Sequence, residues 1–334
     1  MEIIRSFAEF RPYNSKVFNE YFADLSVRVM DIETDGLNPS YSQVILGGLL
    51  SPDEKGDATV TQYFLNKKED EATLLKAYGK TLASADVLIT YNGESFDLPF
   101  LNQRMKKYDL KIDFSAIQSF DLYRILHKYS RLRNILPNLK QKTIERYLGL
   151  SSARKDEISG RQSVALYEHY QRSGSEDSKA KILLHNRDDL VQLISTLRIL
   201  AKLDLHKILF YEGFTVSSQD KRIIIESIAI NKSNLEIVAK TRNVELDYYS
   251  FATAYHAVHK AKEKKLILTI PYDKQREVCF IDLESFGIDF TQLENYPSYE
   301  SGFLIINQRG KTNYAEVNKA IRIVLSELLN GPML

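Results

Sequence analysis

The run Val29-Met30-Asp31-Ile32-Glu33-Thr34-Asp35-Gly36-Leu37 is the stretch of sequence that decides the fold. Its apolar beginning predicts a strand, and side chains two residues apart in a strand point to the same face. Asp31 and Glu33 therefore project together on one face. Met30 and Ile32 enter the core on the other. Two adjacent carboxylates repel each other unless a cation or a proton intervenes, so the pair indicates either a metal site or an exposed polar strand end.

The segments around this run alternate between strand-like and helix-like patterns. Strands are predicted over 27–30, 44–49, 59–64 and 87–90, and a polar helix over 71–83. The polar segment 52–57 contains Gly56 and predicts a hairpin connection between the second and third strands. The order β-β-β-α-β, followed by helices, favours an α/β fold with a mixed sheet over a fully parallel one.

The length of 334 residues is about twice that of a typical domain, so we expect two units. The first, 1–205, carries the α/β pattern and ends in a helical run over 179–203. Four leucines lie on one apolar stripe of that run, namely Leu190, Leu193, Leu197 and Leu200. The second, 206–334, is a β-rich α+β domain. Strands are predicted there over 223–228, 235–238, 266–270 and 303–306, with a closing helix over 314–329.

Composition excludes several classes of protein. Lys plus Arg number 45 and Asp plus Glu 44, so the chain does not coat nucleic acid wholesale, although a local basic groove is permitted. One cysteine, Cys279, excludes an internal disulfide and a cysteine-rich zinc site. We see neither a secretory signal nor the ~18 apolar residues that span a bilayer, so the expected location is the cytoplasm, without a membrane partner.

Two further acidic motifs follow the first strand. Thr90-Tyr91-Asn92-Gly93-Glu94-Ser95-Phe96-Asp97 places a turn after a buried strand and Asp97 near the start of the next helix, where a carboxylate either caps the helix or binds a ligand. In Leu184-His185-Asn186-Arg187-Asp188-Asp189-Leu190, His185 and Asp189 are four apart and share one helix face. A solvated charged turn is the plain alternative for this last motif.

The chain also contains a control for the first motif. Phe280-Ile281-Asp282-Leu283-Glu284 has the same Asp-x-Glu form but lacks the two later acidic motifs around it. We therefore do not expect Asp282 and Glu284 to be catalytic.

Together, an Asp-x-Glu on the first strand, an Asn-Gly-x-x-Phe-Asp after a later strand and an Asp on a late helix resemble the DEDD exonuclease superfamily. The likeness is closest to bacterial proteins that carry its ribonuclease-H-like exonuclease domain. It extends to 138–150 and to Ile158-Ser159-Gly160, covers roughly 25–205, and does not reach the last third of the chain.

The resemblance implies a metal-dependent 3′–5′ exonuclease acting on single-stranded DNA or RNA ends. Four carboxylates would hold two divalent cations, and the matching residues are Asp31, Glu33, Asp97 and Asp189. Two ions about 4 Å apart bind the attacking water and the scissile phosphate and stabilise the leaving oxygen. Oxygen ligands suit Mg²⁺ or Mn²⁺ and disfavour zinc.

The third motif departs from the family patterns. One branch of the superfamily has a Tyr four residues before the last Asp, and the other has a His five residues before it. Here His185 stands four before Asp189, which combines the spacing of one branch with the residue of the other. We expect His185 to be catalytic, either accepting a proton from the attacking water or orienting that water.

Substrate contacts are also implied by position. Thr34, Asn92 and Phe96 lie where the family holds the terminal nucleotide, and an aromatic ring there can stack on a base. Core packing and turn formation are the alternatives for these residues. Basic runs at 104–108, 127–133 and 259–265 either follow a phosphate backbone or are solvated helix faces.

Two other functions compete with an exonuclease. One is an endonuclease of the ribonuclease H type, which only the products would distinguish. The other is a non-catalytic module that binds nucleic acid or protein, although four carboxylates facing a polyanion without metal would gain nothing. The second unit offers a surface for a protein partner, and its sequence does not disclose a role.

Overall fold

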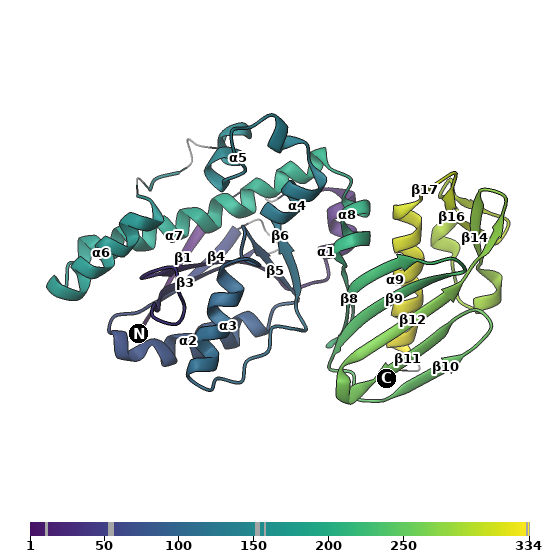
Figure 1. The fold of residues 1–334 in the computed structure, drawn as a ribbon, viewed down its shortest axis with the longest axis horizontal. Coiled ribbons are helices and arrows are strands. Elements are labelled where there is room, and N and C mark those ends of the chain that lie inside the picture. The colour runs from purple at the N-terminus through teal and green to yellow at the C-terminus, as the bar shows by residue number, and fades with distance from the viewer. Residues whose placement is uncertain (11–12, 53–56, 151–153, 157, 332, 334) are drawn as a thin grey trace. The chain divides into compact units, whose positions relative to one another are not determined.

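The computed structural model describes residues 1–10, 13–52, 57–150, 154–156, 158–331 and 333. By its contacts the chain divides into two compact units, Met1–Leu203 and Asp204–Leu334. The first unit contains one sheet and the second contains two, and each unit has its own helices (Figure 1). The two units are described separately below.

The first unit is built on a mixed sheet, as predicted. Its strands in the described residues are β1 (Glu2–Glu9), β2 (Val27–Thr34), β3 (Val44–Pro52), β4 (Asp57–Phe64), β5 (Val87–Thr90) and β6 (Gln118–Asp121). They lie in the order β1-β4-β3-β2-β5-β6, with β1, β4, β3 and β2 antiparallel and β2, β5 and β6 parallel. The sequence did not predict β1 or β6. The predicted hairpin connection, 53–56, lies outside the described residues.

Helices cover both faces of this sheet. They are α1 (Lys16–Phe22), α2 (Glu71–Ala83), α3 (Asp97–Lys107), α4 (Leu122–Tyr129), α5 (Gln141–Tyr147), α6 (Gly160–Ser173) and α7 (Glu176–Thr196). The predicted helical run over 179–203 corresponds to α7 and to the 3₁₀ segment Leu197–Lys202 that follows it directly. Among the described helices, none is long and apolar enough to cross a membrane.

Two successive glycines in β3 let helices approach the sheet on opposite faces. A Cβ on Gly47 would meet the ring of Tyr78 from α2 at 2.8 Å, and a Cβ on Gly48 would meet the amide of Asn186 from α7 at 2.1 Å. Since successive strand residues point to opposite faces, α2 and α7 lie on opposite sides of the sheet (Figure 1). Asp31 pairs with Gly48 in the neighbouring strand, so its side chain shares the face covered by α7.

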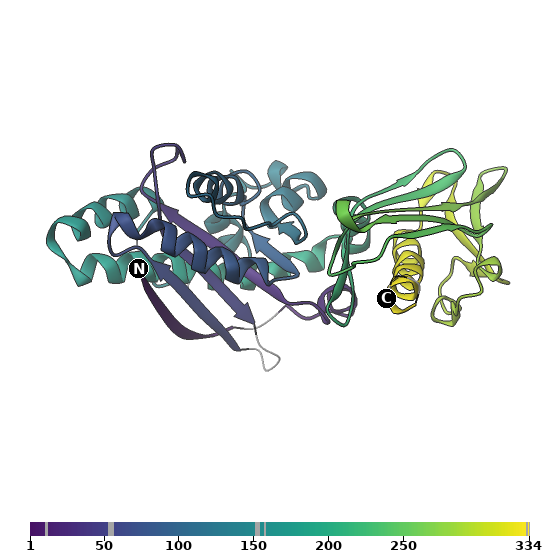
Figure 2. The same ribbon diagram turned by 90° about the horizontal axis from the view of Figure 1, so that it is seen from below.

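The second unit is β-rich, as predicted. One sheet joins β7 (Thr215–Ser218), β8 (Lys221–Ile230), β9 (Asn234–Arg242), β10 (Tyr248–Phe251), β11 (His256–Lys260) and β12 (Lys265–Pro271). A second contains β13 (Asp273–Gln275), β14 (Val278–Asp282), β15 (Tyr299–Glu300), β16 (Phe303–Gln308) and β17 (Lys311–Thr312). Two helices, α8 (Leu205–Glu212) and α9 (Tyr314–Asn330), complete the unit, and α9 lies along one face of the larger sheet (Figure 2). Cys279 is buried in β14.

A buried ion pair joins α2 to α3. Arg104 Nε lies 2.8 Å from Glu71 Oε1, and the exposed fractions of the two side chains are 1% and 0%. The same carboxylate accepts the Val44 backbone N–H and the Tyr108 hydroxyl. The prediction that Arg104 follows a phosphate backbone is therefore wrong, because its guanidinium is committed to the core.

Replacing Arg104 with methionine should lower the free energy of unfolding by about 3–5 kcal/mol, because the Glu71 carboxylate would remain buried without its cation. Denaturant unfolding of the full chain measures this change. The double variant Glu71→Gln/Arg104→Met is the control, and it should recover much of the loss. Equal stability of wild type and Arg104→Met would show that the pair contributes little.

The same pair predicts a pH dependence. Burial opposes ionisation of Glu71, but its hydrogen bonds, led by that from Arg104, hold its pKa below the ordinary value. Its contribution to stability is therefore present above the unfolded carboxyl pKa of about 4.3 and is lost as the pH falls through the lower folded value. The free energies of unfolding of wild type and Glu71→Gln should therefore become more alike as the pH is lowered. A difference that stays constant with pH would contradict this prediction.

Candidate metal centre

Strand β2 presents the first two carboxylates to the face covered by α7. Asp31 is half-buried and Glu33 is buried, with Met30 and Ile32 in the core on the other side. A register shift between Glu33 and Thr34 interrupts the pairing of β2 with β3 at this point. Such irregularities re-aim side chains at the end of a strand.

The third carboxylate comes from the first residue of α3. Asp97 is buried, and its Oδ1 accepts the backbone N–H of Ile32 at 3.1 Å. This hydrogen bond comes from strand β2 and not from the first turn of α3. This bond ties the start of α3 to the middle of β2 and places Asp97 beside Asp31.

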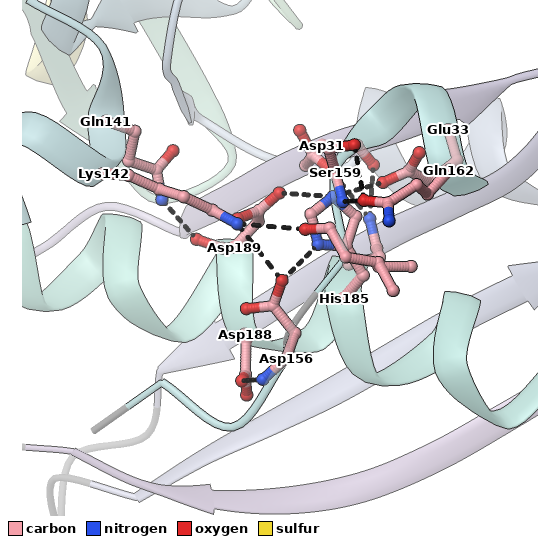
Figure 3. A network of polar contacts seen from close by, with 12 residues as sticks. Asp31, Glu33, Gln141, Lys142, Asp156, Ser159, Gln162, His185, Asp188 and Asp189 are labelled. Atoms are coloured by element: carbon pink, nitrogen blue, oxygen red, sulfur yellow. Dashed lines mark hydrogen bonds and ion pairs between the residues drawn. The ribbon is translucent and has the colours of Figure 1, made fainter. Parts of the chain in front are cut away.

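The remaining two groups lie on one face of α7. His185 is buried and Asp189 is partly exposed. His185 Nε2 lies 3.7 Å from Glu33 Oε1 and 3.6 Å from Asp189 Oδ2. Figure 3 shows the side chains of α7 and β2 converging at this point.

All eight residues proposed from the sequence line one cavity of about 580 Å³, and Leu37, Tyr91, Arg161 and Val164 are among its other lining residues. The eight are Asp31, Glu33, Thr34, Asn92, Phe96, Asp97, His185 and Asp189. Thr34 is buried and donates to the carbonyl of Gly36, and Asn92 has a φ of 68°. Phe96 packs on Phe100 with ring centroids 5.6 Å apart, so core packing and cavity lining are combined in this residue.

Burial first, and neighbouring carboxylates second, raise the pKa values of the four candidate ligands and favour their protonated forms. Burial, and then the neighbouring carboxylates, raise the pKa of Asp31 well above its ordinary value. Burial and the charge of Asp189 raise the pKa of Glu33 to about 8. Burial raises the pKa of Asp97 to about 7, and it also raises the pKa of Asp189 although the nearby His and Arg oppose it. Desolvated like charges of this kind need a cation or protons to coexist.

Asn186 is a supporting residue that the sequence did not reveal. Its Nδ2 donates to Asp31 Oδ2 at 2.8 Å, and its Oδ1 accepts from Gln62 Nε2 at 2.9 Å. It fits because Gly48 has no side chain. The paired glycines in a buried strand were the available signal, since glycine inside a strand often marks a close approach.

The segment 154–156 also reaches the site, although no sequence pattern indicated this. Arg154 is almost buried, donates to both oxygens of Glu145, and lies 2.5 Å from Asp189 Oδ1. The other oxygen of Asp189 faces His185. Arg154 therefore fixes one oxygen of Asp189 and leaves the second toward the cavity.

The donor set fits divalent cations. Ligand atoms of Glu33, His185 and Asp189 all lie within 4.8 Å of one another, and Asp31 and Asp97 line the same cavity. Carboxylate oxygens are the ligands that Mg²⁺ and Mn²⁺ prefer. The control motif differs, since Asp282 ends β14 and Glu284 begins a 3₁₀ turn, with both side chains exposed.

Comparison with known proteins matches the part of the chain that contains this site. A family model described as RNase_H superfamily matches residues 29–201, just over half of the chain. The protein YprB of Bacillus subtilis, which is uncharacterized, is 28% identical over 170 residues, 49% of this chain and 39% of that protein. A DNA polymerase of Methanocaldococcus jannaschii is 32% identical over 95 residues, 27% of this chain and 6% of the polymerase. The matches thus span well under two thirds of either relative.

Solved structures give weaker matches. The family B DNA polymerase of Pyrobaculum calidifontis has a TM-score of 0.43 and 18% identity, over 53% of this chain and 24% of that one. Exonuclease I of E. coli, in complex with a dT13 oligonucleotide, has a TM-score of 0.35 and 10% identity, over 64% and 55% of the two chains.

Removing one carboxylate should stabilise the metal-free protein. In the presence of a chelator, Asp97→Asn should have a free energy of unfolding about 1–3 kcal/mol higher than wild type. The substitution removes a buried carboxylate and its repulsion but keeps an acceptor for the Ile32 N–H. Thermal unfolding with and without Mn²⁺ gives the complementary result. Wild type should gain about 2.7 kcal/mol at a hundredfold excess of Mn²⁺ over its dissociation constant, and the variant much less. If Mn²⁺ did not change the stability of the wild-type protein, that result would contradict a metal site.

Proposed function

The chain belongs to the RNase H superfamily, and on that premise we propose that it is a two-metal nuclease that shortens single-stranded nucleic acid from its 3′ end. The observation that carries this proposal is the convergence of four carboxylates and one histidine in a single cavity. The four carboxylates come from β2, α3 and α7, which are far apart in the sequence. A fold that buries so much like charge at some cost to stability is typical of a functional site.

Asp31, Glu33, Asp97 and Asp189 would hold two Mg²⁺ or Mn²⁺ ions. When bound, such ions polarise a phosphodiester and lower the pKa of a water molecule. The chain itself fixes the donors before any ion arrives. Asn186 holds Asp31, the backbone of Ile32 holds Asp97, and Arg154 holds Asp189. Each of these three contacts engages one carboxylate oxygen and leaves the second oxygen for an ion.

His185 has the position required to handle a proton. It is buried, and its Nε2 faces Glu33 and Asp189 at the cavity wall. A neutral imidazole there accepts the proton of the attacking water. The His185→Ala variant should accordingly lower kcat by ~10²–10⁴-fold with folding intact.

The cavity also offers groups for a terminal nucleotide. Its volume of about 580 Å³ lies within the range of roughly 300–1,000 Å³ usual for ligand pockets. Phe96 provides an aromatic surface for a base, and Thr34 and Asn92 provide polar groups at the same wall. A binding module without metal would bring a polyanion against these carboxylates, which favours the enzyme.

A second cavity in the first unit offers a binding surface, or track, for the remainder of a single-stranded nucleic acid. It has a volume of about 300 Å³ and is lined by Tyr129, Arg131, Tyr147 and Lys202 among others. Cations and aromatic rings together are the usual surface for single strands. The run 127–133 thus supplies part of this track, whereas in the run 259–265 His259 is buried and Lys260 pairs with Glu263.

The test is cleavage of 5′-labelled single-stranded DNA and RNA by the full chain with Mg²⁺ or Mn²⁺. We expect a metal-dependent ladder of shortened products, whose yield identifies the preferred sugar. Internal products would indicate an endonuclease, and binding without any cleavage would indicate a non-catalytic module.

Two matched variants make this test specific. Asp31→Asn should abolish cleavage, because it removes a charged donor from the cluster. Asp282→Asn makes the same change in the exposed control motif and should cleave at the wild-type rate. Loss of activity in both variants, or in neither, would contradict the assignment of the site.

A further inference from the structure

A carboxylate outside the four candidate ligands lies behind His185. Asp156 Oδ2 is 2.6 Å from His185 Nδ1, and the exposed fractions of the two side chains are 1% and 5% (Figure 3). The same carboxylate pairs with two cations, since Arg154 Nη1 lies 2.6 Å from Oδ1 and Lys142 Nζ lies 3.3 Å from Oδ2, and this pairing favours the ionised form. An ionised carboxylate can only accept, so Nδ1 of the ring must carry the hydrogen.

The position of Asp156 is itself fixed. Arg154 Nη1 donates to Asp156 Oδ1 at 2.6 Å. The backbone N–H groups of Lys155 and Asp156 donate to Asp188 Oδ2 at 2.5 and 2.8 Å. Asp188 and His185 both lie on α7, so the carboxylate is tied to the helix whose histidine it contacts.

This arrangement determines what the other side of the ring presents. With the hydrogen on Nδ1, a neutral His185 has its lone pair on Nε2. Nε2 is the atom that faces Glu33 and Asp189 in the cavity. The opposite tautomer would direct a hydrogen into the cavity and could accept no proton there.

We propose that Asp156 is a positioning residue for His185, which holds the ring in the Nδ1–H tautomer with Nε2 toward the cavity. The consequence for catalysis rests on the proposed nuclease function, but the tautomer itself does not. Neither the sequence motifs nor the four-carboxylate pattern includes Asp156. A merely structural anchor would fix the segment 154–156 to α7 without controlling the ring, and Asp188 could do this alone.

The kinetic test compares Asp156→Asn with Asp177→Asn. Asp177 lies on α7, the helix of His185, in an exposed ion pair with Lys181. The Asp177→Asn variant therefore controls for the change from aspartate to asparagine. Asp156→Asn should lower kcat by ~10²–10⁴-fold with KM within a few-fold of wild type, because an amide can stabilise the wrong tautomer. Asp177→Asn should match wild type. Equal kcat in the two variants would overturn the proposal.

The spectroscopic test does not depend on cleavage. Nitrogen-15 NMR of histidine-labelled, full-length protein with Mg²⁺ at alkaline pH reports which ring nitrogen carries the hydrogen, and loss of the signal in His185→Gln assigns it. Wild type should show Nδ1–H, and Asp156→Asn should shift the signal toward Nε2–H. Wild-type Nε2–H would overturn the proposal even if Asp156→Asn does not fold. Nδ1–H in a protein that cleaves nothing would support the positioning role and refute the nuclease.

Discussion

The structure of the first unit depends on the mutual repulsion of carboxylates that share one desolvated cavity. Burial and neighbouring charges raise the pKa of Asp31, Glu33 and Asp97. Without compensation the cluster would destabilise the fold, because each buried charge needs a counter-charge or a hydrogen bond. The surrounding residues are arranged as partial compensation, and a bound cation would supply the remainder. This constraint explains why so many polar side chains near the cluster are buried.

The compensation differs among three of the carboxylates. Asn186 serves Asp31, the backbone of Ile32 serves Asp97, and Arg154 serves Asp189. Each contact uses one oxygen and orients the other. Precise orientation of donors before binding is what lowers the cost of assembling a metal site. The first unit thus combines an unfavourable charge cluster with a rigid support, and this combination fits the proposed nuclease function.

This support comes from elements that lie far apart in the sequence. Helix α7 contributes His185 and Asp189, and it can approach β3 only because Gly48 leaves room for Asn186. The segment 154–156 is held by Asp188 of the same helix. One helix therefore carries two cavity groups and two anchors. The second unit is outside the residues that the superfamily match covers, and its exposed Asp282 and Glu284 show how little an isolated Asp-x-Glu implies.

The sequence by itself determined the mixed sheet and the β-rich second unit, because strand and helix periods fix which side chains share a face. The gathering of Asp31, Glu33, Asp97, His185 and Asp189 was implied by the resemblance to the DEDD superfamily and not by any local period. The edge strands β1 and β6 were not predicted from the sequence, because their patterns are weak and their pairing partners are distant in the sequence. Only the tertiary structure decided that Arg104 is a core residue, that Asn186 reaches Asp31 and that Asp156 stands behind His185. Each of these depends on a contact between segments far apart in the chain, and no local period encodes such a contact.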